Sequence, residues 1–145
     1  MATITQIELA LKAKLQSLGY FKEVESIAEF LAKSADELAI LAPSAYIAYQ
    51  GRTFASPGMN TSKRDRNMVF AIVLVQRNFV SQEILLHGTA SKKGIYDIVE
   101  EVCDLLIDED LGLDITPIDP MKDDIIGGDQ MVVIYGLWLE TKTRR

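Results

Sequence analysis

The stretch that decides the fold reads Met68-Val69-Phe70-Ala71-Ile72-Val73-Leu74-Val75, eight consecutive apolar residues that are mostly β-branched or aromatic. A strand with one solvated face alternates apolar and polar residues, so a continuous run indicates a strand buried on both faces. The run is too short to cross a bilayer as a helix. A second stretch of the same kind, Met131 to Leu139, predicts another such strand. Other parts of the protein must therefore cover both sides of the sheet.

The composition predicts a single domain that spans residues 1–145. The chain is 48% hydrophobic and 25% charged, as in ordinary globular proteins, and is long enough to bury a core. Its one cysteine, Cys103, excludes an internal disulfide and fits a reducing compartment. Residues 1–5 lack the basic flank and apolar core of a signal peptide, and no segment predicts a transmembrane helix. The net charge of −6 argues against a general DNA-binding surface.

Apolar residues at helical spacing predict three helices, over residues 3–18, 25–41 and 92–110. Thr3 and Gln6 fit a capping box at the start of the first helix. The second helix is expected to break near residues 34–36, with Ser34 or Asp36 as a cap, and to end before Pro43. The helical stretches therefore occupy the start and the middle of the chain.

The remaining pattern predicts four strands, over residues 44–50, 68–77, 113–119 and 130–141. Pro117 cannot donate a ladder hydrogen bond, so the third strand is expected at an edge of the sheet. Residues 20–24 are expected to form a short link, with an extended conformation as the alternative. Residues 78–90 fit either a short strand or a buried loop, and residues 123–129 a loop with a Gly-Gly turn.

The predicted order is therefore α-α-β-β-α-β-β. Short links between consecutive strands favour antiparallel pairing, which gives an α+β fold with a mainly antiparallel four-stranded sheet and about three helices. Those helices are expected on one or both faces of the sheet. If they cover only one face, the other requires a second chain, because a large exposed apolar face favours association.

The charges are unevenly distributed. Residues 52–66 form a long connection with a Pro-Gly turn and a net charge of +3, and residues 142–145 form a short basic tail. Between Asp97 and Asp124 there are eleven acids and one lysine, a net charge of −10. This polarity suits head-to-tail contacts between copies, or a ring with faces of opposite sign. The alternative is that the acids only keep a helix face solvated.

The sequence predicts no catalytic residue, cofactor or metal site. His87 is the only histidine, and an inert buried Cys103 is favoured over a Cys/His nucleophile pair. One histidine and one cysteine are too few for a usual zinc site. The acids at 108–110 and 114 fit solvated surface, and residues 119–124 depart from a calcium-binding EF-hand loop at Met121. Gly127-Gly128 fits a hairpin turn rather than a phosphate loop.

Two segments resemble a known phage family. The helix that leads into Ala42-Pro43-Ser44-Ala45-Tyr46-Ile47-Ala48-Tyr49-Gln50-Gly51 is similar to the Mu-like prophage tail/neck family. So is Gly94-Ile95-Tyr96-Asp97-Ile98-Val99, which opens a helix that ends before Leu111-Gly112-Leu113. The resemblance extends from about residue 3 to residue 140, and its motifs are structural rather than catalytic.

The resemblance implies a virion protein that is tail-terminator-like. Members of the family look like tail terminators, which form hexameric rings that cap the tail tube and join it to the head connector. The implied partners are further copies, the tail tube protein and head-connector or neck proteins. DNA would pass through the lumen without specific binding, with no membrane involved. The implied location is the tail or neck of the virion, after assembly in the host cytoplasm.

Within that setting the basic connection is expected to contact the neighbouring ring of tube or connector. The predicted interface consists of Arg52, Phe54, Met59, Lys63, Arg64 and Arg66. Two alternatives stay open: a neck or head-completion adaptor with the same fold, and, more remotely, a small enzyme that uses His87.

Overall fold

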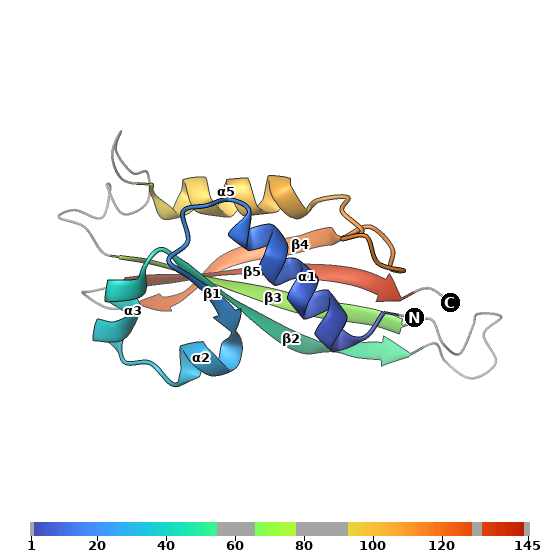
Figure 1. The fold of residues 1–145 in the computed structure, drawn as a ribbon, viewed down its shortest axis with the longest axis horizontal. Coiled ribbons are helices and arrows are strands. Elements are labelled where there is room, and N and C mark those ends of the chain that lie inside the picture. Colours follow the sequence, from blue (N-terminus) through green and yellow to red (C-terminus); the bar gives the residue numbers. More distant parts are fainter. Residues whose placement is uncertain (1, 55–65, 78–92, 129–131, 144–145) are drawn as a thin grey trace.

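The structure is a computed structural model that describes residues 2–54, 66–77, 93–128 and 132–143. Figure 1 shows a twisted sheet with helices on both of its faces. The elements follow one another along the chain as α1 (Ile4–Gln16), β1 (Glu23–Ser26), α2 (Ile27–Leu31), α3 (Ala35–Leu41), β2 (Ser44–Phe54), β3 (Arg66–Arg77), α5 (Ile95–Leu106), β4 (Asp119–Gly128) and β5 (Val132–Thr143). The α+β class is therefore confirmed.

The sheet has five strands in the order β1-β2-β3-β5-β4, so the prediction of four strands was wrong. The additional strand is β1, which pairs parallel with β2, whereas the other pairs are antiparallel. It includes the end of the link predicted at 20–24. Of its four residues only Val24 is buried, so no apolar alternation marks the strand in the sequence. The described residues form four helices rather than the predicted three.

The apolar stretch from Met68 to Val75 lies in β3, the middle strand, which pairs with β2 on one side and β5 on the other. Met68, Phe70, Ile72 and Leu74 point to one face of the sheet and are at most 1% exposed. Val73 and Val75 point to the opposite face and are also buried. Burial of alternate side chains on opposite faces explains why this strand carries no polar residue between Met68 and Val75.

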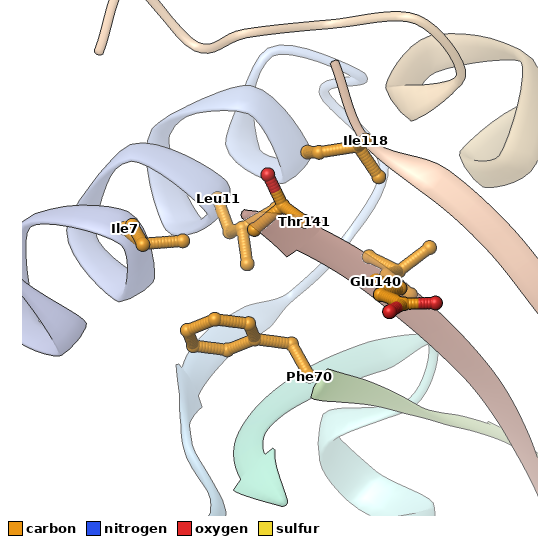
Figure 2. A pocket seen from close by; sticks show the side chains of 7 residues that line it. Ile7, Leu11, Phe70, Ile118, Glu140 and Thr141 are labelled. Atoms are coloured by element: carbon orange, nitrogen blue, oxygen red, sulfur yellow. The ribbon is translucent and has the colours of Figure 1, made fainter. Parts of the chain in front are cut away.

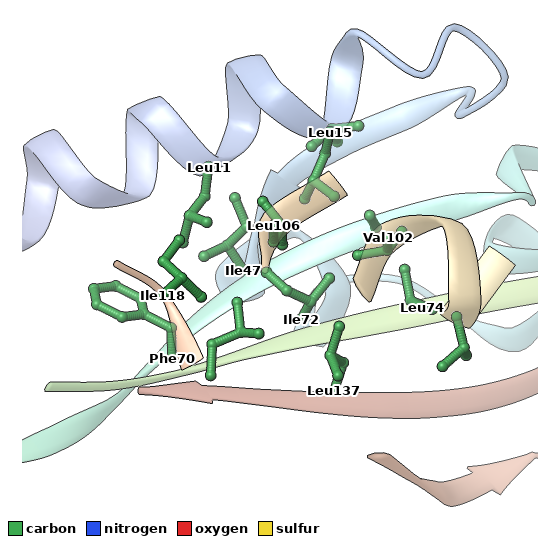
Figure 3. Close-up of a cluster of buried hydrophobic side chains, with 14 of the residues drawn as sticks. Leu11, Leu15, Ile47, Phe70, Ile72, Leu74, Val102, Leu106, Ile118 and Leu137 are labelled. Atoms are coloured by element: carbon green, nitrogen blue, oxygen red, sulfur yellow. The ribbon is translucent and has the colours of Figure 1, made fainter. Parts of the chain in front are cut away.

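Helices α1 and α5 cover the first face of the sheet. Leu11 and Leu15 of α1 and Leu106 of α5 point toward β2, β3 and β5 in Figure 3. The capping box of α1 is present, because Thr3 accepts from the backbone of Gln6 at 3.1 Å and the Gln6 side chain accepts in return at 2.9 Å. These two amphipathic helices supply most of the apolar cover of the first face.

Helices α2 and α3 lie on the second face (Figure 1), α2 beside β1 and β2 and α3 over β3 and β5. Leu38 and Ala39 pack there with Tyr46, Val73 and Val75. The predicted break in the second helical stretch is confirmed. Helix α2 ends at Leu31, and α3 starts after the N-cap Ser34, whose hydroxyl accepts from the backbone of Glu37 at 3.3 Å. Both faces of the sheet therefore carry helices, but α2 and α3 cover only one end of the second face.

The C-terminal predictions need correction. Residues 113–118 form no named strand; Ile115 makes a single bridge to Thr143, while Ile118 is held by backbone hydrogen bonds to Asp108 and Glu109. The edge strand is instead β4, where a loop was expected at 123–129, and it contains Pro120 and the glycines of the predicted turn. Nine of its ten residues are exposed, so burial imposes no alternating pattern on its sequence. The ambiguous segment 78–90 lies outside the described residues.

Candidate interaction surfaces

The nucleophile candidates do not form a site among the described residues. His87 lies outside them. The thiol of Cys103 is free and half-buried on α5. Burial, followed by the nearby carboxylates of Asp104 and Asp123, raises the pKa of this thiol, whereas a reactive thiol needs a lowered pKa. In the part of the chain that the structure describes, no group of three or more His, Cys, Asp or Glu side chains is arranged to hold a metal ion.

A small hollow opens between α1 and β5 (Figure 2). It has an empty volume of about 180 Å³ that includes open solvent, and its lining comprises Ile7, Leu11, Phe70, Ile118, Leu139, Glu140 and Thr141. Ligand pockets usually enclose about 300–1,000 Å³ and combine apolar walls with converging polar groups. Most of the lining residues belong to the core that α1 packs against. The hollow is therefore a shallow gap at the rim of the core.

The six predicted interface residues divide into two groups. Arg52 and Phe54 belong to β2, and Arg66 begins β3, with Phe54 opposite Arg66 in the register. The connection between the strands is therefore residues 55–65, shorter than the predicted 52–66, because the ladder continues beyond the bulge near Gly51. Met59, Lys63 and Arg64 lie in this connection, outside the described residues. The β2–β3 ladder thus brings Arg52, Phe54 and Arg66 to one end of the sheet.

An apolar and acidic strip follows the edge formed by α5 and β4. Tyr96, Glu100 and Asp104 repeat every four residues along α5, which places them on one side of the helix. Tyr96 is 41% exposed, and Ile125 on β4 is 56% exposed. We define the α5–β4 strip as Tyr96, Glu100, Asp104, Ile107, Asp123 and Ile125. Its three apolar members are all substantially exposed, and its other three members are acids.

Contacts between α5 and the sheet hold this strip in place. The ring of Tyr96 meets Tyr135 of β5 edge to face, with 6.4 Å between the ring centroids. The Tyr135 hydroxyl donates a 2.9 Å hydrogen bond to Asp123, and Tyr135 lies opposite Ile125 in the ladder. Burial and the Asp123 carboxylate raise the pKa of Tyr135 to about 12. Both sides of the strip are thus fixed to the same strand, β5.

Another apolar group lies on the second face of the sheet, at the end that α2 and α3 do not cover. Trp138 packs against Gly136 and Ile126, and the ammonium of Lys122 lies 4.6 Å from the centre of its indole ring. Ile126 is 51% exposed and Trp138 is partly exposed. The expectation that both sides of the sheet are apolar is thus met, and the chain's own helices cover one end of this second face.

The sequence did not single out the apolar members of these surfaces. Tyr96, Ile107 and Ile125 are separated in the chain by acids and loops, and in sequence each resembles a core residue. The only available signal was the high density of acids between Asp97 and Asp124. Which of the interspersed apolar residues stay exposed depends on how α5 and β4 pack on β5.

A comparison with known protein families shows which family the chain belongs to. Residues 3–131 match the family described as Bacteriophage Mu, Gp37. The chain belongs to the Mu Gp37 family. This membership confirms the resemblance to a Mu-like phage family and indicates a phage structural or morphogenesis protein. The matched region begins at the N-cap of α1 and ends just before β5.

Two further findings accompany the match to the Gp37 family. No curated protein shows significant similarity to the chain. Among the described residues, no helix has the length and apolar character needed to cross a membrane.

Proposed function

We propose that this Gp37-family protein is a tail terminator, a structural virion protein that acts as a ring rather than as an enzyme. The ring, which we propose to be hexameric, caps the tail tube and joins it to the head connector. Membership of the Gp37 family carries this proposal. The fold supports it in one further respect: the described surface offers exposed apolar strips rather than an enclosed pocket with converging polar groups.

A ring requires each copy to present complementary surfaces to its neighbours. The α5–β4 strip lies at one edge of the sheet, and α2, whose Leu31 is 75% exposed, lies beside β1 at the other edge (Figure 1). Ile40 of α3, 70% exposed, belongs to a helix that packs over β3 and β5. Apolar side chains at separate places on one small domain suit repeated contacts between copies. The proposed partners beyond the ring are the tail tube protein and the head-connector or neck proteins.

The basic end of the β2–β3 ladder is the second element of the proposal. Arg52, Phe54 and Arg66, with Met59, Lys63 and Arg64 of the adjoining connection, are proposed as interface residues toward a neighbouring ring of tube or connector. The net charge of −6 supports a lumen that lets DNA pass without specific binding, since an acidic body repels phosphate. The proposed location is the tail or neck of the virion, after assembly in the host cytoplasm.

Tail length tests the proposal. In phage that lack the protein, electron microscopy should show abnormally long tail tubes without heads, because nothing stops tube polymerisation. Restoring the wild-type gene should return tails to their normal length. Tails of normal length without the protein, with heads attached, would contradict the terminator role. Tails of normal length that fail to join heads would instead favour the neck or head-completion adaptor.

A further inference from the structure

The α5–β4 strip combines features that together indicate a docking surface. Its acids Glu100, Asp104 and Asp123 take part in none of the ion pairs among the described residues. Exposed apolar side chains flank these acids: Tyr96, Ile107 and Ile125 are 41%, 48% and 56% exposed. A partner that fits such a surface must bring apolar side chains and positive charge together.

The edge strand within the strip is protected against simple strand addition. Pro120 lacks a backbone donor, Lys122 places a charge on the edge, and bulges interrupt β4 on both sides of Asp123. Edge prolines, lysines and bulges are devices that prevent another strand from extending a sheet. Docking on this surface must therefore use side chains rather than a continued ladder.

The chain itself contains a segment with the required chemistry. Residues 52–66 carry a net charge of +3, with Phe54 and Met59 among the cations. The three acids of the strip are opposite in sign to the net charge of +3 on this segment. We propose that the α5–β4 strip binds the basic 52–66 segment of a second copy of this chain. This inference rests on the ring proposed above and gives that ring its contact between adjacent copies.

Distances along the sheet favour a contact between copies over one within a single chain. Ile125 is aligned through Tyr135 with Leu74, which lies eight residues along β3 from Arg66, or about 26 Å. Lys63 lies three residues before Arg66, so its backbone is at most about 10 Å from that of Arg66. Lys63 and Arg64 therefore cannot reach the Tyr96 and Ile125 end of their own strip, so a contact there has to come from another copy.

The proposed contact is heterologous, because different surfaces of the two copies meet. Repetition of such a contact closes into a ring when the rotation between copies permits, or otherwise continues as a filament. Of the two arrangements that fit the charge polarity, this inference selects head-to-tail contact between copies. Lys63 and Arg64 are thereby assigned to the contact between copies, and the contact with the tube or connector falls to the other residues of the proposed interface.

Charge exchange tests the inference. One variant reverses the strip (Glu100→Lys with Asp104→Lys), a second reverses the segment (Lys63→Glu with Arg64→Glu), and a third carries all four changes. Sedimentation at low salt should show self-association at least tenfold weaker in the first two variants, and restored in the third. An equimolar mixture of the first two should also associate, because each then supplies the charge that the other needs.

A control variant receives the same change in charge elsewhere. Glu8→Lys with Asp114→Lys alters acids outside the strip and should associate as wild type does. The inference is overturned if wild type stays monomeric, if the first two variants associate as wild type does, or if the third variant fails to recover. Tail lengths in the same phage variants are scored separately. A terminator role that survives while charge exchange fails would remove only this contact.

Discussion

The hydroxyl of Tyr46 donates a 2.6 Å hydrogen bond to Oε2 of Glu23, while Lys33 approaches Oε1 of the same carboxylate at 3.3 Å. This relationship ties β2, β1 and the end of α2 together. Phe30 of α2 also packs on the Tyr46 ring, with 5.5 Å between the centroids. The short parallel strand β1, with four residues, is thus held by side chains as well as by its ladder.

Replacing Tyr46 with Phe should lower the free energy of unfolding by about 1.5–3 kcal/mol, because the partly buried Glu23 carboxylate loses a charge-assisted hydrogen bond. Urea denaturation followed by circular dichroism measures the change. Tyr135→Phe is the matched control, since its hydrogen bond to Asp123 is exposed and its loss should cost less. Equal losses in the two variants would show that the Tyr46–Glu23 hydrogen bond stabilises the fold no more than the exposed Tyr135–Asp123 bond does.

Tyrosine ionisation should reduce stability at high pH. Burial and the Glu23 carboxylate raise the pKa of Tyr46 above its ordinary range, and burial with Asp123 raises the pKa of Tyr135 to about 12. A group with a raised pKa in the folded state stabilises the fold fully below its unfolded pKa, here about 10. That contribution should decline as pH rises from about 10 through 12. Absorbance titration of phenolate, folded and in urea, measures the shift; identical titrations would contradict it.

The core between α1 and the sheet gives a paired test on one helix. Leu11 is 1% exposed, so Leu11→Ala should cost about 2–5 kcal/mol through lost burial and the cavity left behind. Leu9 lies on the same helix but is 59% exposed, and Leu9→Ala should change stability by less than about 0.5 kcal/mol. Urea denaturation compares the two variants. A comparable loss for Leu9 would mean that the outward side of α1 is covered.

Gly136 tests the packing around the single tryptophan. An alanine Cβ there would lie 2.7 Å from the Trp138 ring and from Cδ1 of Ile126. Gly136→Ala should therefore displace the indole, change its fluorescence and cost about 1–3 kcal/mol. Gly127→Ala is the control, because nothing lies within 4 Å of its added Cβ. Unchanged fluorescence in the Gly136 variant would contradict this packing.

The elements that could be predicted from the sequence are those that pack against the core, because burial requires apolar residues at regular positions. β3 and β5 carry continuous apolar runs, and α1 and α5 carry apolar stripes, because each packs against the core. β4 left no such pattern, since most of its residues face solvent, and β1 is too short to show one. Strand prediction therefore succeeded in the middle of the sheet and failed at both edges.

The candidate surfaces were predictable only in part. The acids of the α5–β4 strip are evident from charge counts, whereas the exposure of Tyr96 and Ile125 depends on tertiary packing. Apolar residues in a sequence do not reveal whether a partner or the chain's own core covers them. The basic segment was found by charge alone, and its two ends proved to continue β2 and β3.

A low-resolution reconstruction of the assembled particle, with this protein carrying an added tag domain, tests the terminator assignment most directly. We expect a ring of tag density at the junction between the end of the tail tube and the head connector. Tag density within the head, along the tube or nowhere in the particle would contradict it.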